Sequence, residues 1–199
     1  MTKVYSDLAV SADGFATGLN QREDAPFGDI DENWLHGWMF ETADENRAEV
    51  DAIVDSGATI MGRNMFGPVR GAWDREWRGW WGPNPPYHGP VFVLTHFAHD
   101  PIEMEGGTTF LFVTDGIESA LEQARAAAGD RDISIAGGPS TVNQYLAAGL
   151  LDELRLHVTP CVLGAGERVF EGVPAQPLQL ISVRPASRVT HLTYRTVRP

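Results

Sequence analysis

Three short segments of this sequence carry residues that could hold a phosphorylated ligand. They are Gly62, Arg63 and Asn64, then Thr95 and His96, and finally Gly137, Gly138, Pro139, Ser140 and Thr141. Glycines let an anion approach backbone N–H groups, and a helix that starts after them adds a positive dipole end. An arginine guanidinium matches the oxygens of a phosphate. Together the segments predict a site for a ligand with several phosphates, such as a dinucleotide.

Each segment also has a purely structural interpretation. The glycine pair would suit a tight strand-to-helix turn that binds nothing, and it is not the GxGxxG fingerprint, because Pro139 and Ser140 follow it. Arg63 could form a surface ion pair. Thr95 and His96 could simply end a strand.

A cluster of tryptophans is the least ordinary feature of the chain. Four of the six tryptophans lie between residues 73 and 81. Trp73, Trp77 and Trp81 could form a wall or lid that stacks on a flat ring, which makes them candidates for substrate binding. The alternative is a patch of core or a dimer interface.

Residues typical of metal sites and covalent catalysis give only weak signals. His96, His99 and Asp100 lie on one loop, but without further ligands at a suitable spacing we expect no metal. The single Cys161 excludes an internal disulfide and a CxxC motif, and it fits a small core position. The sequence contains no GxSxG motif for a serine nucleophile.

Length and composition limit the possible classes of protein. The chain has 199 residues, of which 43% are hydrophobic and 21% charged, which predicts one domain over residues 1–199. Its net charge of −12 argues against nucleic acid and against an anionic membrane surface as partners. No apolar run reaches the roughly 18 residues of a membrane span. We expect a cytoplasmic protein.

Apolar periodicity and turn residues predict an α/β fold. Strands are expected at 4–10, 58–61, 91–94, 109–113, 133–135, 154–158, 178–185 and 189–197, and helices at 29–39, 44–55, 116–128 and from 139 onward. The strand, glycine turn, helix and strand within 133–166 imply a parallel sheet. We therefore expect three layers, with a mostly parallel central sheet flanked by helices and antiparallel strands at the C-terminal end. The three polar segments would then meet at the carboxyl ends of the strands.

The helix at 29–39 also carries candidate acidic residues. Asp29 or Asp31 would cap it, and Trp34, Leu35 and Trp38 would lie on one face.

Several stretches resemble a known enzyme family. Residues 60–66, IMGRNMF, resemble the I-M-G-R-x-T-[WF] stretch of dihydrofolate reductases, and residues 91–96, VFVLTH, are similar to their V-x-V-L-[ST]-[RS] strand. A closer similarity is to the reductase domain of bacterial riboflavin-pathway deaminase–reductases and its stand-alone relatives. It rests on S-x-D-G at 11–14 and on GLLDELRLHVTPCVLGAG at 149–166. The resemblance covers nearly the whole chain and implies a dihydrofolate-reductase-like fold.

This resemblance implies NADPH as the cofactor and a homodimer as the assembly. Segment 62–64 would hold the adenosine-side phosphates, and segment 95–96 would lie beside the 2′-phosphate. Residues 138–141, after Gly137, would wrap the pyrophosphate. Thr17 would lie near the nicotinamide.

Other positions depart from the family pattern. Met65 replaces the usual hydroxyl residue, and His96 replaces Arg or Ser. The riboflavin-pathway reductases carry Glu where this chain has Ala136, and Lys where it has Asp7. Both positions bear on their pyrimidine phosphate substrate, so we expect a different substrate here.

The source of the proton is expected among acidic residues near the N-terminus. Asp13 or Asp31, or a water ordered by them, would supply it. A dihydrofolate reductase needs a buried carboxylate on its first long helix, for which Asp31 and Glu32 are candidates, with Asp29 behind them. The alternative for Asp29 and Asp31 is a helix cap.

Two hypotheses follow. The first is an NADPH-dependent reductase of a small pterin- or pyrimidine-like substrate, related to 5-amino-6-(5-phosphoribosylamino)uracil reductase. The second is a non-catalytic dinucleotide-binding or sensor protein on the same fold.

Overall fold

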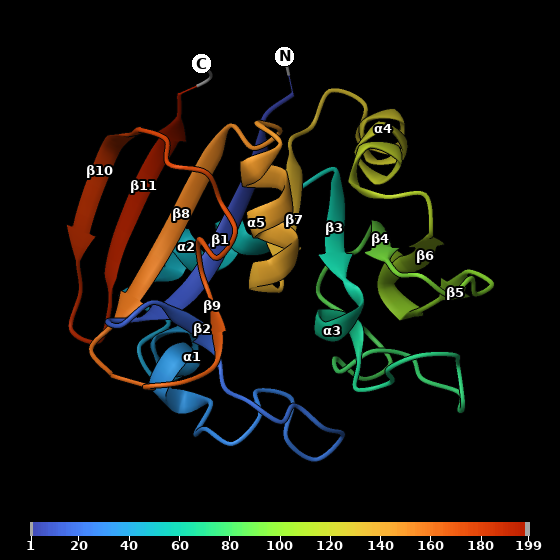
Figure 1. Cartoon of the computed structure of the whole chain (residues 1–199), viewed down its shortest axis with the longest axis horizontal. Helices are drawn as coiled ribbons and strands as arrows, with labels where there is room; N and C mark the ends of the chain where they lie inside the picture. The colour runs from blue at the N-terminus through green and yellow to red at the C-terminus, as the bar shows by residue number, and fades with distance from the viewer. Residues whose placement is uncertain (1, 198–199) are drawn as a thin grey trace.

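The computed structural model describes residues 2–197 and shows one large sheet with helices on both faces (Figure 1). The prediction of a single domain over 1–199 thus includes residue 1 and residues 198–199, which lie outside the described residues. Nine strands lie in the order β10-β11-β8-β1-β7-β3-β4-β6-β5. Their bounds are β1 Val4–Ser11, β3 Ala58–Gly62, β4 Pro90–Leu94, β5 Ile102–Glu103, β6 Thr109–Val113, β7 Ile133–Gly137, β8 Glu153–Thr159, β10 Leu178–Pro185 and β11 Thr190–Thr196. A small second sheet pairs β2 (Phe15–Thr17) with β9 (Glu167–Arg168).

The centre of the large sheet is parallel. Strands β1, β7, β3 and β4 lie side by side and run in one direction, and β8 pairs with β1 in the same direction. Strands β11 and β10 continue the sheet in antiparallel fashion. The predicted fold class, including the antiparallel C-terminal strands, is therefore confirmed. Because carboxyl ends of parallel strands share one edge, the loops after β7, β3 and β4 come together there.

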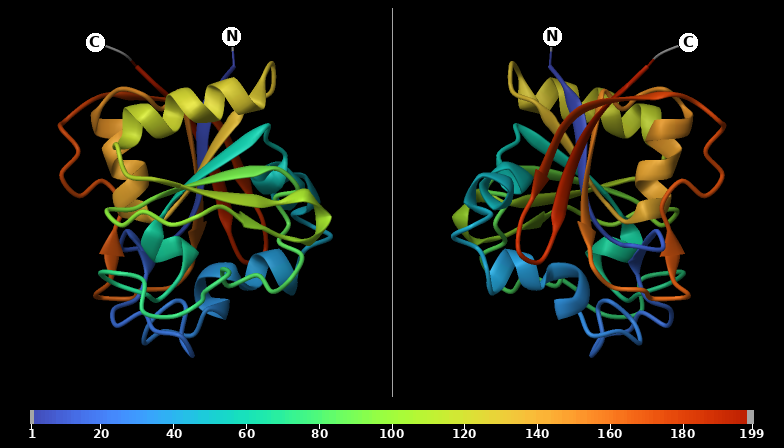
Figure 2. Two further views of the ribbon diagram at one scale, coloured as in Figure 1. Left: turned by 90° about the vertical axis from the view of Figure 1, so that its right-hand side faces the viewer. Right: turned by 90° about the vertical axis from the view of Figure 1, so that its left-hand side faces the viewer.

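Helices cover the two faces of the sheet. Helices α4 (Ile117–Ala128) and α5 (Pro139–Ala147) lie on one side, and α1 (Asn33–Phe40) and α2 (Arg47–Val54) lie on the other (Figure 2). The apolar faces of α4 and α5 pack on the sheet to form the main core. Its largest fully buried side chains include Tyr145, Leu146, Ile133, Ile135, Ile60 and Leu151.

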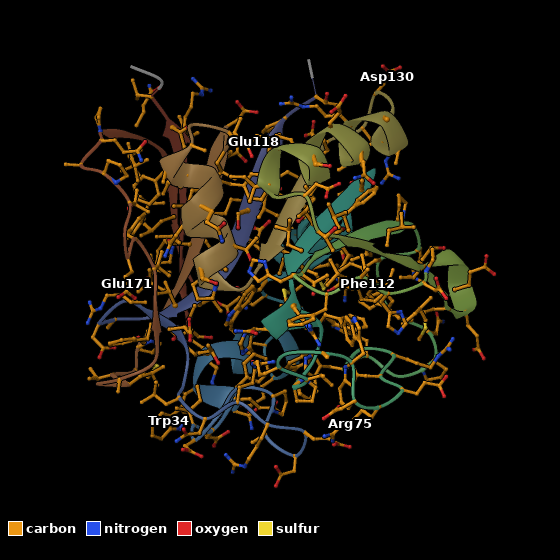
Figure 3. The ribbon with its side chains drawn as sticks, turned by 45° about the vertical axis from the view of Figure 1, so that its right-hand side comes forward. Trp34, Arg75, Phe112, Glu118, Asp130 and Glu171 are labelled. Atoms are coloured by element: carbon orange, nitrogen blue, oxygen red, sulfur yellow. The ribbon has the colours of Figure 1, made fainter. Side chains whose placement is uncertain are left out.

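A second core cluster lies between β3, β4 and β6 and the irregular segment that follows α3 (Arg63–Phe66). Successive strand residues face opposite sides, so Met61 and Val93 face this cluster while Ile60 and Phe92 face the main core. Phe112 points toward the irregular segment (Figure 3), with its ring centroid 5.2 Å from that of Trp73. The short helix η1 (Glu105–Gly107) precedes β6.

The first helix differs from its prediction. It begins at Asn33, whose backbone N–H donates to Asp31 Oδ1 at 3.0 Å, whereas Asp29 forms an ion pair with Arg22. The helix buries Leu35 and Trp38, but Trp34 is 53% exposed. Trp34 is exposed because it lies in the first turn, at the outer rim of the molecule (Figure 3).

The end of β3 and the first turn of α5 are in close contact. Gly62 has an extended backbone with φ −78° and ψ 156°, which any residue can adopt. A Cβ atom at this position would nevertheless collide with the buried hydroxyl of Thr141. The lack of a side chain at residue 62 therefore allows α5 to start directly beside α3.

We expect Gly62→Ala to lower the free energy of unfolding by about 1–3 kcal/mol, the usual range for overpacking. Thr141→Ala removes the hydroxyl that the new methyl group meets, so the double variant should recover much of this loss. Chemical denaturation of the four proteins measures the coupling. Strictly additive effects of the two substitutions would contradict this contact.

Candidate functional site

A cavity of about 380 Å³ opens beside the carboxyl ends of β1 and β7. Its volume falls within the roughly 300–1,000 Å³ typical of small-molecule sites. Its walls come from β1, the segment around β2, α1, α3 and the start of α5. Five of the predicted cofactor residues line it: Thr17, Asn64, Gly138, Pro139 and Ser140.

The glycine pair forms the turn from β7 into α5. Gly137 has a φ of 130°, a conformation that favours glycine, and its peptide bond to Gly138 is cis. Gly138 precedes the first residue of α5, and no side chain among the described residues caps the helix there. The helix has nine residues. Its N-terminal N–H groups and dipole thus form the kind of site that binds an anion.

Arg63 and Thr95 meet at the same edge. Arg63 Nη1 donates to Thr95 Oγ1 at 3.3 Å, and the guanidinium lies 3.7 Å from the ring centroid of Trp73. Its Nε and Nη2 atoms are buried and have no hydrogen-bond partner within residues 2–197. Burial, followed by repulsion from Arg70, lowers the Arg63 pKa. Buried donors without an acceptor are unfavourable, and a phosphate oxygen would supply one.

The remaining predicted cofactor residues lie in or beside this arrangement. Thr17 Oγ1 donates to the Phe27 carbonyl at 3.2 Å at the cavity wall. His96 is exposed, one residue beyond buried Thr95. The structure thus brings the three polar segments to one edge, as the sequence predicted, while the role of each residue stays a prediction.

The tryptophans lie outside the cavity. Trp77 Nε1 donates to the Phe66 carbonyl at 3.0 Å, and the Trp81 ring lies 6.0 Å from that of Phe110 in the second core cluster. Trp73 instead stacks on Arg63. Trp77 and Trp81 therefore fit the alternative interpretation of a core patch. The register of β3 and β6 turns apolar side chains toward them, and their placement in a wall of the substrate site is not supported.

The two carboxylates predicted to supply a proton also lie outside the cavity lining. Asp13 accepts hydrogen bonds from Ser11 Oγ at 2.6 Å and from the N–H groups of Leu163 and Gly164 at 3.1 and 2.7 Å. These bonds, led by that from Ser11, lower its pKa to about 2. Asp13 is then ionised at neutral pH and poorly suited to donate a proton. Asp31 is exposed and supports the first turn of α1.

The cavity contains further ionisable residues. Asp7 lies at a position that the family resemblance relates to the substrate, whereas His36, Arg70 and Glu167 were not predicted from the sequence. The Asp7 side chain is 4% exposed and lies 3.1 Å from His157 Nε2. Burial lowers the His36 pKa to about 4. A second signal for Asp7 was its charge in the middle of the otherwise apolar strand VYSDLAVS.

Residues 2–197 also lack two other kinds of site. In this part of the chain, no three His, Cys, Asp or Glu side chains converge as metal ligands would. No helix there combines the length and apolarity needed to cross a membrane.

Comparison with known proteins identifies one family over nearly the whole chain. The family model of the RibD C-terminal domain matches residues 2–192. The uncharacterized protein YyaP of Bacillus subtilis is 25% identical over 204 residues, which cover 96% of this chain and 94% of that protein.

Solved structures show the same fold. A Shewanella sp. PV-4 protein described as a riboflavin biosynthesis protein has a TM-score of 0.65 at 21% identity, covering 99% of this chain and 100% of that one. Dihydrofolate reductase from Enterococcus faecalis, in complex with NADP(H), has a TM-score of 0.58 at 15% identity, covering 98% and 96%. The chain therefore has a dihydrofolate-reductase-like fold and belongs to the RibD C-terminal domain family, a reductase-type family.

Proposed function

We propose that the protein is an NADPH-dependent reductase of a small heterocycle with a pterin- or pyrimidine-like ring. The observation that carries the proposal is Arg63, whose guanidinium has two buried donors without a partner in the described chain and lies beside Thr95. The cavity lies at the same edge of the sheet, so a dinucleotide could extend from Arg63 into it. Family membership and the NADP(H) of the Enterococcus reductase support this cofactor.

The residues present fit an extended dinucleotide, which would supply a hydride from its nicotinamide ring. Arg63 and Thr95 would bind the 2′-phosphate through charge-assisted and hydroxyl hydrogen bonds. The uncapped start of α5, with Gly138 and Ser140, would bind the pyrophosphate. Thr17 would orient the nicotinamide at the cavity wall.

The cavity favours a ring that carries N–H donors over a phosphorylated substrate. Asp7 and Ala136 line it at the positions where the riboflavin-pathway reductases carry Lys and Glu. A carboxylate attracts N–H groups and repels a phosphate. The substrate would therefore be a small ring without a phosphate at this position. The homodimer that the resemblance implies stays a prediction.

Replacing Arg63 tests the cofactor site. We expect Arg63→Ala to weaken NADPH binding by about 10- to 100-fold, because each charge-assisted hydrogen bond contributes about 1.5–3 kcal/mol, and to change NADH binding by less than about twofold. Parallel fluorescence titrations with NADPH and NADH measure both. Arg75→Ala is the matched control, since it removes the same charge from an arginine already paired with Asp74 and Glu23. Equal losses of affinity for NADPH and NADH would show that Arg63 does not bind the 2′-phosphate.

Replacing Trp73 tests whether this residue contributes to cofactor binding or to substrate binding. A stacked guanidinium gains about 0.5–2 kcal/mol from an aromatic face, so Trp73→Leu should weaken NADPH binding by about 2- to 30-fold. The KM for a pterin probe should stay unchanged, because Trp73 lies outside the cavity lining. Steady-state kinetics with 7,8-dihydropterin and NADPH would separate the two constants. A raised KM for the pterin with unchanged NADPH affinity would instead indicate that Trp73 contacts the substrate.

Turnover separates the reductase from the non-catalytic alternative. Wild-type protein should oxidise NADPH, seen as loss of its absorbance, in the presence of pterin or pyrimidine probes. Tight binding without oxidation would favour a sensor.

A further inference from the structure

A chain of buried hydrogen bonds leads from the cavity wall across the sheet. Asp7 Oδ1 lies 3.1 Å from His157 Nε2, and His157 Nδ1 lies 2.7 Å from His191 Nδ1. His191 Nε2 lies 2.9 Å from Asn46 Oδ1. The chain thus connects β1, β8 and β11 with the start of α2, and Asp7 is its member that lines the cavity.

Asn46 fixes the direction of these bonds. Its Nδ2 donates to the carbonyls of Trp38 and Thr42, at 3.3 and 2.9 Å, and its Oδ1 accepts from Arg184 Nη2 at 2.9 Å. A carbonyl can only accept a hydrogen bond and a guanidinium can only donate one. The reversed amide is therefore excluded. His191 Nε2 must carry a proton, because it faces an oxygen acceptor.

The proton on His191 Nε2 determines those on the next ring. Burial, followed by the neighbouring His157, lowers the His191 pKa to about 4, so His191 is neutral at pH 7 and its Nδ1 is an acceptor. His157 Nδ1 must then be the donor. If His157 Nε2 had a lone pair and Asp7 were ionised, two acceptors would face each other. One further proton therefore lies between His157 and Asp7.

Aromatic and charged side chains surround this proton on the sides away from the cavity. Trp38 covers both imidazoles, with ring centroids 4.7 Å from His157 and 5.1 Å from His191. Arg155 Nη1 lies 3.4 Å from Asp7 Oδ2 and holds the second carboxyl oxygen. Other groups that interact electrostatically with Asp7, His157 or His191 include Tyr5 on β1, His36 on α1, Glu45 just before α2, Glu49 on α2 and Arg184 on β10. Glu153 on β8 pairs with Arg155.

We propose that Asp7 and His157 store a proton and deliver it to a ring nitrogen of the substrate during reduction, an inference that rests on the proposed function. In this step the carbon of a ring C=N bond accepts a hydride, and the π electrons move to the nitrogen. The nitrogen takes the proton held between Asp7 and His157. The dihydronicotinamide is oxidised, the C=N bond becomes CH–NH, and water returns a proton to the pair. Asp7 touches the substrate, whereas His157 and His191 are positioning residues.

Histidine ¹⁵N NMR of the whole chain at pH 7 tests the stored proton without any ligand. We expect His191 to carry its only proton on Nε2 and His157 to carry one on Nδ1, with its Nε2 bonded to a further proton. Asp7→Asn should change the His157 Nε2 signal, because an amide N–H would replace the shared proton, and should leave the His191 pattern unchanged. A proton on His191 Nδ1 would overturn the proposal, because the chain would then run in the opposite direction.

The kinetic test uses Asp7→Asn with NADPH and 7,8-dihydropterin. General acids contribute about 10²- to 10⁴-fold to rates, so kcat should fall at least about 100-fold while the NADPH Kd changes by less than about twofold. Ser6→Ala is the matched control, since Ser6 is the preceding residue of β1 and faces the opposite side of the sheet. Thermal unfolding of both variants checks the fold.

The outcomes separate this inference from the proposed function. An Asp7→Asn variant that reduces the pterin as fast as wild type would refute proton delivery while leaving the reductase intact. Wild-type protein that neither binds NADPH nor reduces the probe would count against the proposed function. The histidine spectra would still decide whether the pair holds a proton.

Discussion

The candidate site depends on the close approach between the end of β3 and the first turn of α5. Gly62 leaves room for the Thr141 hydroxyl, so the strand and the helix meet with only the Thr141 side chain between them. Arg63 then leaves the sheet in α3, and the glycine pair at 137–138 turns into α5 beside it. Parallel pairing of β7 and β3 gives this contact its register. A bulkier residue at position 62 would displace both halves of the proposed dinucleotide site.

This edge of the sheet carries a cationic side chain at one end and an acidic side chain at the other, which suits a phosphate and a ring with N–H groups. On one side the Arg63 guanidinium lies near the rings of Trp73 and Phe97, and two of its donors lack partners in the described chain, which makes an environment for phosphate. On the other side the cavity wall carries Asp7, joined to His157, an environment for a ring with N–H groups. In a chain with a net charge of −12, the guanidinium of Arg63 is a local positive site for a phosphate.

Local patterns in the sequence were sufficient for the strands and the polar loops, but not for contacts between distant residues. Apolar alternation and glycine turns predicted the parallel centre and the meeting of residues 62–64, 95–96 and 137–141. Part of the hydrogen-bonded chain formed by Asp7, His157 and His191 joins strands that lie more than a hundred residues apart in the sequence. The chain therefore depends on the order and register of the strands, which no local sequence pattern contains. The tryptophans were ambiguous for the same reason. Their clustering in the sequence suggested that they stack on a ligand. Only the register of β3 and β6 shows that Trp77 packs on the core.

A crystal structure of the protein with NADPH would test the central claim most directly, which is that the edge formed by β7, β3 and β4 holds the whole dinucleotide. We expect the 2′-phosphate at the guanidinium of Arg63, the pyrophosphate at the start of α5 and the nicotinamide in the cavity beside Thr17. A dinucleotide bound elsewhere, or in this cavity with its 2′-phosphate away from Arg63, would contradict the account.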